Sequence, residues 1–248
     1  MSGHSKWSTI KRKKGALDQK RGKIFTKIIR EITISARLGS SDENANPRLR
    51  KAILTAKAAN MPADNIKRAI QRGTGELPGV SYEEAIFEGY GPGGVAIMVE
   101  VMTDNRKRTV AELRHLMTRY GGNLGEPGCV AWMFEKKGLI TVNKDDVNED
   151  ILFEHIIEGG GEDFSEEEDA FEITTAPEHL IDVHEYLEKQ GFAIRNSEIE
   201  MLPKNTVRVT GSVVGKVLKL MESLEDHDDI QKVHANFDIP DEELVGVE

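Results

Sequence analysis

The sequence predicts an α+β multidomain protein, with an N-terminal three-helix bundle followed by two α+β domains that contain mixed or antiparallel sheets. Apolar residues recur at helical spacing in the first third of the chain, and strand-like apolar runs alternate with helical ones after residue 81. The charge also reverses near residue 75. Residues 1–75 hold 18 lysines and arginines against 5 aspartates and glutamates, whereas the rest of the chain holds 15 against 38.

Spacing and helix-breaking residues predict the three helices of the first third. A helix is expected over residues 17–38, where four-residue steps separate its apolar residues Ile24, Ile28 and Ile32. The Asn46-Pro47 pair supplies an N-cap and a first helical residue for a second helix, which extends to about Asn60. A third helix follows the Met61-Pro62 pair and ends at the glycines of residues 73–75.

After a linker at residues 74–81, the chain alternates between the two apolar periods. Strands are expected near residues 85–90, 94–101, 130–135, 139–142, 170–175, 192–202 and 206–210. Helices are expected at residues 109–120, 146–158, 178–190 and 214–225. This order is typical of sheets that carry helices on one face.

The cations of the first third form the candidate nucleic-acid-binding surface. Eight of them lie within residues 6–23, a density that repels itself in water but releases counterions when it neutralises phosphates. Trp7 adds a ring that can stack on a base or fix the arm on the bundle. A merely solvated charged face is the alternative, but the same sign continues along all three helices. The candidate residues are His4, Lys6, Trp7, Lys11, Arg12, Lys13, Lys14, Lys20, Arg21, Lys23, Lys27, Arg30, Arg48, Arg50, Lys51, Lys67 and Arg68.

A second candidate contact lies at the strand-to-helix junction after Val101. Asp104 or Asn105 can cap the helix, which places Arg106, Lys107 and Arg108 in its first turn. The helix macrodipole disfavours cations at that end. Three cations there indicate an anionic partner, although a local carboxylate such as Glu112 is the alternative.

Two other segments have ordinary structural interpretations. Residues 89–94 match the G-x-G-x-x-G pattern of dinucleotide-binding loops, but Pro92 lies inside the match and a strand follows it, so a glycine hairpin turn is expected. Residues 145–172 hold 13 carboxylates and no lysine or arginine, without a calcium-loop or zinc-helix motif. We interpret them as a solvated acidic surface that repels nucleic acid or attracts a basic protein partner.

Composition narrows the class of protein. The single cysteine, Cys129, excludes an intramolecular disulfide and lies among apolar neighbours, as a buried structural thiol would. No nucleophile motif is present, so an enzyme is not expected, and neither is a cofactor or a metal. The longest apolar run, residues 95–99, is far too short to span a bilayer, and no signal sequence is evident. A cytoplasmic protein with no membrane partner is expected.

Several ordered motifs closely resemble those of the YebC/PmpR family, which includes the mitochondrial translational activator of cytochrome c oxidase. They are Gly-His-Ser-Lys-Trp at 3–7, Asn-Pro-Arg-Leu-Arg at 46–50, Asn-Met-Pro-Ala-Asp-Asn-Ile at 60–66, the segment 87–94, Thr-Asp-Asn-Arg at 103–106, Gly-Gly-Asn-Leu-Gly at 121–125, and Asn-Phe-Asp-Ile-Pro at 236–240. The resemblance runs nearly from end to end. It implies a basic helical bundle at 1–77, a discontinuous central α+β domain at 78–135 plus 205–248, and an inserted acidic α+β domain at 136–204.

The resemblance and the charge pattern together predict a nucleic-acid-binding regulator of gene expression. By the resemblance it is a DNA-binding transcriptional regulator. A ribosome-associated factor that binds ribosomal RNA and activates translation is the alternative, and an adaptor that recruits a protein partner is the second alternative. The target is thus DNA or ribosomal RNA, and the sequence does not choose between them.

Overall fold

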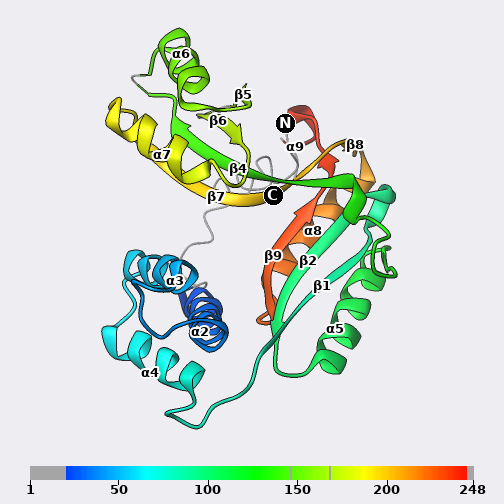
Figure 1. Cartoon of the computed structure of the whole chain (residues 1–248). Helices are drawn as coiled ribbons and strands as arrows, with labels where there is room; N and C mark the ends of the chain where they lie inside the picture. The colour runs from blue at the N-terminus through cyan, green and yellow to red at the C-terminus, as the bar shows by residue number, and fades with distance from the viewer. Residues whose placement is uncertain (1–20, 146, 168, 245–248) are drawn as a thin grey trace.

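The computed structural model describes residues 21–145, 147–167 and 169–244. Its helices and strands form three groups, each with an apolar core of its own (Figure 1). The first group is helical, and each of the other two contains a four-stranded sheet with helices. The predicted α+β multidomain fold with an N-terminal helical bundle is confirmed.

Three helices make the first group: α2 (Arg21–Leu38), α3 (Pro47–Ala58) and α4 (Ala63–Thr74). Their shared core contains Ile32, Leu49 and Ala56. Asn46 is the N-cap of α3, as predicted, because its side chain accepts a hydrogen bond from the Leu49 backbone. The same side-chain amide donates at 2.8 Å each to the Ser35 carbonyl of α2 and to the Ser40 carbonyl just after it, and so fixes the turn between the two helices.

The central group is an antiparallel sheet in the order β3-β1-β2-β9, with two helices on one face (Figure 1). Its strands and helices are β1 (Glu83–Tyr90), β2 (Ala96–Thr103), β3 (Asn123–Leu124), β9 (Ile230–Ala235), α5 (Arg106–Arg119) and α8 (Ser212–Glu225). A parallel pair, β8 (Val207–Arg208) with β10 (Phe237–Asp238), and the short helix α9 (Asp241–Leu244) complete it. The turn between β1 and β2 contains η1 (Pro92–Gly94), where Gly93 and Gly94 have φ of 74° and 79°. Such angles favour glycine, which agrees with a hairpin turn.

The third group is an antiparallel sheet in the order β5-β6-β4-β7 with two helices. It consists of β4 (Phe134–Asn143), α6 (Glu149–Gly159), β5 (Asp163–Glu166), β6 (Ala170–Thr175), α7 (Leu180–Lys189) and β7 (Ile194–Pro203). Apolar side chains of α6 and α7, among them Leu152 and Val183, pack with Ile140 and Ile173 of the sheet.

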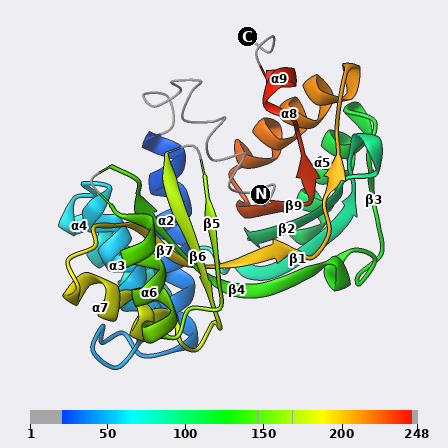
Figure 2. The same cartoon turned by 90° about the horizontal axis from the view of Figure 1, so that it is seen from above.

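Two long strands join the third group to the central sheet. β4 and β7 run from their own sheet toward β1, β2 and β9 (Figure 2). There Phe134 of β4 packs against Ala96 and Met98, which lie on the face of the central sheet opposite α5 and α8. The central sheet is therefore covered by apolar side chains on both faces.

A buried charge network lies beside this apolar contact. His234 of β9 is fully buried, and its Nε2 lies 2.9 Å from a Glu100 carboxylate oxygen while its Nδ1 lies 3.3 Å from Glu200 of β7. Lys232 of β9 pairs with Glu200 and with Glu198 at 2.5 and 2.6 Å. Burial alone lowers the pKa of His234, but the nearby carboxylates of Glu100 and Glu200 outweigh it and leave that pKa raised.

Several details differ from the sequence-based expectation. Strand β9 was not predicted, nor were the short strands β3, β5 and β10 and the short helix α9. The expected strand near residues 130–135 is instead the 3-10 turn η2 (Ala131–Met133), with strand structure beginning only at Phe134. Strand β9 was missed because Lys232 and His234 interrupt its apolar pattern. In the structure these two residues pair with a carboxylate of β7 rather than with water.

Candidate nucleic-acid interface

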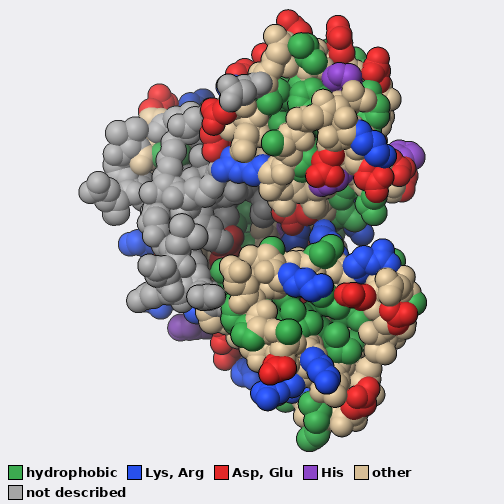
Figure 3. All heavy atoms as spheres, turned by 90° about the vertical axis from the view of Figure 1, so that its left-hand side faces the viewer, with side chains coloured by type: hydrophobic (Ala, Val, Ile, Leu, Met, Phe, Trp, Pro, Cys, Tyr) green, Lys and Arg blue, Asp and Glu red, His purple; other side chains and the backbone are tan. Residues whose placement is uncertain are grey.

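Cations on α3 and α4 form an exposed surface. The apolar faces of these helices, including Leu49 and Ile53 on α3 and Ile66 on α4, are buried in the bundle core, so the polar faces point outward. Seven cations of these helices are exposed, and Arg48 and Arg50 among them contact other groups of the protein. We call the other five the α3–α4 surface, and they are Lys51, Lys57, Lys67, Arg68 and Arg72. None of them forms an ion pair with another residue in the described part of the chain. Lysine and arginine side chains are spread over this lobe among apolar ones (Figure 3).

Three cations of α2, Lys23, Lys27 and Arg30, have the opposite environment, because they contact the C-terminal end of α8 and the segment after it. Lys23 Nζ donates to the Asp226 carbonyl at 3.0 Å and lies 3.6 Å from the carboxylate of that residue. Lys27 Nζ donates to the Glu225 carbonyl at 2.8 Å. The last carbonyls of a helix lack partners within it and carry partial negative charge, so cations stabilise that end.

Arg30 is the third of these α2 cations, and little of its side chain is exposed. Its guanidinium Nη1 lies 2.7 Å from the Asp229 carboxylate and donates to the Met102 carbonyl at 3.1 Å. The side chains of Arg30 and Asp229 are 11% and 3% exposed. A buried pair of this kind fixes the bundle against the central sheet, because separating it would leave a charge without a partner.

Arg108 reaches the same aspartate from the other side. Its Nη2 lies 2.7 Å from Asp229 and 2.8 Å from Asp104, and Thr109 also donates to Asp229 at 2.7 Å. Burial raises the pKa of Asp229, but the hydrogen bonds from Arg108, Thr109 and Arg30 lower it by more, so that the net pKa is about 2. The three cations predicted at the start of α5 thus have different environments, and Arg108 is paired within the protein.

The other two cations of that first turn form no ion pair among the described residues. Arg106 lies over the ring of Phe87, with its guanidinium carbon 5.4 Å from the ring centroid. Lys107 is exposed and forms no ion pair among the described residues. Asn105 is the N-cap, since its side chain accepts from the Arg108 backbone at 3.1 Å.

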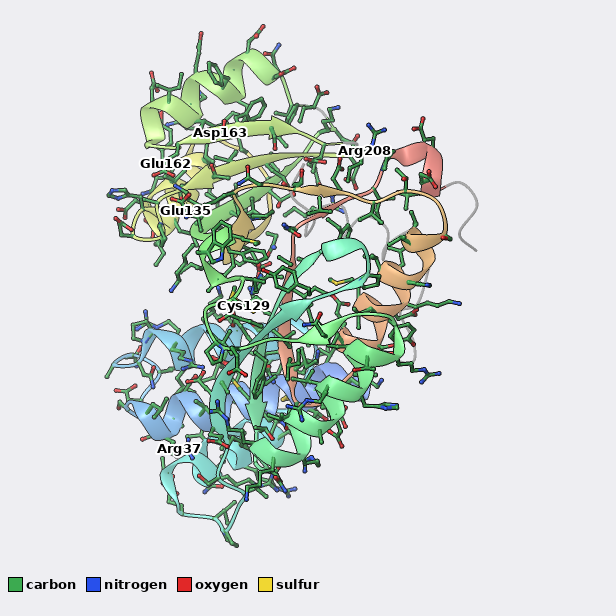
Figure 4. All side chains as sticks on the ribbon, turned by 90° about the vertical axis from the view of Figure 1, so that its right-hand side faces the viewer. Arg37, Cys129, Glu135, Glu162, Asp163 and Arg208 are labelled. Atoms are coloured by element: carbon green, nitrogen blue, oxygen red, sulfur yellow. The ribbon has the colours of Figure 1, made fainter. Side chains whose placement is uncertain are left out.

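Several arginines of the bundle contact carboxylates, carbonyls or a hydroxyl of the protein itself. Arg48 pairs with Glu31 of α2 at 2.7 Å and with Glu84 of β1 at 2.5 Å, and hydrogen bonds to both raise its pKa. Arg50 donates to the Glu43 and Asn44 carbonyls. Arg37, labelled on the bundle in Figure 4, donates to Ser81 in the segment that leads into β1. These contacts anchor the bundle to the linker and to the central sheet.

Part of the predicted binding surface lies outside the described residues. This part comprises His4, Lys6, Trp7, Lys11, Arg12, Lys13, Lys14 and Lys20. Arg21 is the first residue of α2. Among the predicted site residues that are described, four are exposed and form no ion pair with another described residue, namely Lys51, Lys67, Arg68 and Lys107. Arg106 is also exposed, and its guanidinium lies over the ring of Phe87. The remaining six whose side chains are described are held by groups of the protein, and they are Lys23, Lys27, Arg30, Arg48, Arg50 and Arg108.

A cleft of about 810 Å³ lies where α2, α5 and the segment after α8 meet. Glu112, His227 and Asp229 line it and are of the residue types that bind metal ions. Their carboxylate oxygens and imidazole nitrogens lie within 4.8 Å of one another. His227 already uses both ring nitrogens, since Nε2 lies 2.9 Å from Glu112 and Nδ1 accepts from the Asp229 backbone. Asp229 is neutralised by two arginines. The protein's own groups therefore satisfy this set, which sequence analysis did not single out because its members come from distant segments.

Cys129 is half-buried beside the central sheet, where Figure 4 labels it. Burial and the nearby Glu88 raise the pKa of its thiol. That direction agrees with a structural thiol rather than an activated one. Within the described residues, no helix is both long enough and apolar enough to cross a membrane.

The three groups, of which the first is the basic bundle, define the class: a multidomain α+β protein with a cationic helical domain. Family models match it over most of its length, one described as the TACO1/YebC protein N-terminal domain over residues 5–76 and one as the TACO1/YebC second and third domain over residues 82–237. The chain belongs to the TACO1/YebC family.

Relatives and a solved structure agree with that membership. A "probable transcriptional regulatory protein" of Desulfotalea psychrophila is 61% identical, with 99% of this chain and 98% of the relative covered. A protein of the same description from Geobacter sulfurreducens is 59% identical, with 98% of each covered. The crystal structure of a conserved hypothetical protein from Aquifex aeolicus matches with a TM-score of 0.82 at 50% identity, covering 92% of this chain and 94% of the other.

Proposed function

We propose that the protein is a nucleic-acid-binding regulator of gene expression, and specifically a DNA-binding transcriptional regulator. The α3–α4 surface carries this proposal, since its exposed cations have no protein partner among the described residues. Such cations neutralise phosphates and release counterions, which supplies affinity without reading sequence. The names of the relatives support the regulatory role. We assign no catalytic role to any residue.

We propose three domains with bounds 1–77, 78–135 plus 205–248, and 136–204. The separate apolar cores support this division, and so does the pairing of β4 with β7, which brings the two ends of the third domain together. In this arrangement the basic bundle contacts nucleic acid. The N-terminal arm, which lies outside the described residues, and Lys107 extend the contact.

The proposal is tested by fluorescence anisotropy with a labelled DNA duplex and a labelled structured RNA over a range of salt concentrations. The double variant K67A/R68A removes two cations of the α3–α4 surface, and K216A/K219A removes two exposed lysines of α8 as a matched control. We expect K67A/R68A to weaken binding and to reduce the salt slope by about 2, because each phosphate contact contributes about 0.9. The control should bind as the unaltered protein does.

Preferential binding of the RNA would favour the ribosome-associated alternative, whereas preferential binding of the duplex would support the transcriptional role. Equal loss in both double variants would mean that only net charge matters, and the assignment to α3 and α4 would then fail. Absence of binding to either nucleic acid would overturn the proposed function and would favour the protein-recruiting adaptor.

A further inference from the structure

The outward face of α6 combines exposed apolar side chains with carboxylates. Phe153 and Ile157 are 48% and 61% exposed, whereas Leu152 and Ile156 of the same helix are buried in the core of the third domain. Asp150, Phe153, Glu154 and Ile157 follow the spacing i, i+3, i+4, i+7 and so share one face of the helix.

This face continues onto an edge of the sheet. The ring of Phe153 lies 6.1 Å from the ring of Phe164 at a tilt of 58°, and Phe164 belongs to β5, the outer strand of its sheet. We call the set Asp150, Phe153, Glu154, Ile157 and Phe164 the α6 surface. Phe153 is partly covered by this ring contact, but Ile157 has more than half of its surface in water. Large apolar residues that cluster in the open often mark a place where another molecule binds.

The charges around the apolar pair specify the partner. Acidic residues of β5 and of the turn before it are partly neutralised by lysines, since Glu162, labelled in Figure 4, pairs with Lys137, and Glu166 pairs with Lys144. In contrast, Asp150 and Glu154 of α6 form no ion pair with another described residue. The α6 surface therefore offers apolar contact flanked by uncompensated negative charge, which repels nucleic acid.

We propose that the α6 surface is the docking site for an amphipathic helix of a partner protein, one whose apolar face is flanked by lysines and arginines. Phe153 and Ile157 pack against the apolar face of that helix, and Asp150 and Glu154 pair with its cations. Such charge pairs set orientation and association rate, while the buried apolar side chains supply most of the affinity. This inference goes beyond the proposed function, because the surface lies on a different domain from the cationic bundle.

The probe is a fluorescein-labelled peptide of about 14 residues, made of leucine and lysine with leucine at i, i+3, i+4 and i+7. A peptide of the same composition with leucine and lysine in strict alternation is the control, since it cannot present an apolar helical face. Anisotropy with the full chain should show binding of the first peptide and at least about tenfold weaker binding of the second.

Variants locate the site. I157S should weaken binding of the helical peptide about tenfold or more, and D150N/E154Q should weaken it at low salt with a smaller effect at high salt. I181S is the matched control, because Ile181 of α7 is 69% exposed in the same acidic domain. Thermal unfolding of I157S checks that the domain remains folded.

Weakening by I157S with unchanged binding in I181S supports the proposal. Equal effects of the two substitutions, equal binding of the two peptides, or no binding of either would overturn it. None of these outcomes depends on DNA or RNA binding, so failure of the docking site and failure of the proposed function are distinguishable.

Discussion

Lys23, Lys27 and Arg30 of α2 belong to the same basic bundle as the cations of the α3–α4 surface, yet the two sets have opposite environments. Lys23, Lys27 and Arg30 contact carbonyls and carboxylates at the end of α8 and in the segment after it. Lys67 and Arg68 have no partner among the described residues. A run of positive charge in a sequence therefore contains two populations, one that assembles domains and one that is available to an anionic ligand.

Among the changes that test this comparison, removal of the Asp229 carboxylate is expected to have the largest effect on stability. D229A leaves the buried Arg30 guanidinium without its ion-pair partner, which should reduce the free energy of unfolding by about 3–5 kcal/mol. Urea denaturation followed by circular dichroism measures it. D228A, at the exposed neighbouring carboxylate, is the control and should change stability by less than about 0.5 kcal/mol. Equal stability of D229A and the unaltered protein would show that Arg30 is not held by this pair.

The same carboxylate predicts an acid transition. The pKa of Asp229 falls from 3.8 to about 2 in the folded protein, so the folded state favours the ionised form. The resulting stability, about 2 kcal/mol, is fully present above pH 4 or so and is lost as the pH falls toward 2. Urea titrations between pH 2 and 6 measure this loss. D229N should show a weaker pH dependence over the same range, and an identical dependence would contradict the assignment.

The contact between the central and third domains should respond to pH in the opposite direction. The pKa of His234 is raised, so its contribution is fully present below about pH 6.5 and is lost as the pH rises through the folded pKa. H234Q should lower stability by about 1–3 kcal/mol at pH 6 and should flatten this part of the pH profile. Thermal unfolding from pH 5 to 9 tests it. The groups that face His234, namely Glu100, Glu200 and Lys232, are unchanged in this variant.

A smaller effect is expected at the start of α5, where Lys107 can be removed without disturbing Arg108, its neighbour that pairs with Asp229. K107A should leave stability within about 0.5 kcal/mol, because Lys107 has no ion pair among the described residues. It should weaken DNA binding and reduce the salt slope by about 0.9 if it contacts a phosphate. An unchanged slope would remove Lys107 from the interface.

Local rules predicted the fold where the signal lay within one segment. The Asn46-Pro47 start of α3, the end of α2 at Leu38 and the glycine turn near Gly93 follow from residue types that act on their own backbone. Strand β9 escaped because Lys232 and His234 look like solvent-facing residues, although carboxylates of β7 and β2 pair with them. Such compensation depends on segments far apart in sequence, so a local apolar pattern does not reveal it.

The candidate site shows the same division. The sequence located the basic bundle, but it did not distinguish Arg30, which lies against Asp229, from Arg68, which is exposed. That distinction depends on the segment after α8, because Asp229 in that segment lies 199 residues from Arg30 in the chain. The residues outside the described part of the chain, including Trp7 and Lys11, remain predictions.

The most direct test of this account measures the salt dependence of DNA binding for two double variants of equal charge, K23A/K27A on α2 and K67A/R68A on α4. We predict that K67A/R68A reduces the salt slope by about 2 with unchanged stability, whereas K23A/K27A leaves the slope unchanged and lowers stability by about 1 kcal/mol. A slope reduced by K23A/K27A and unaffected by K67A/R68A would contradict the division between domain-assembling and ligand-binding cations.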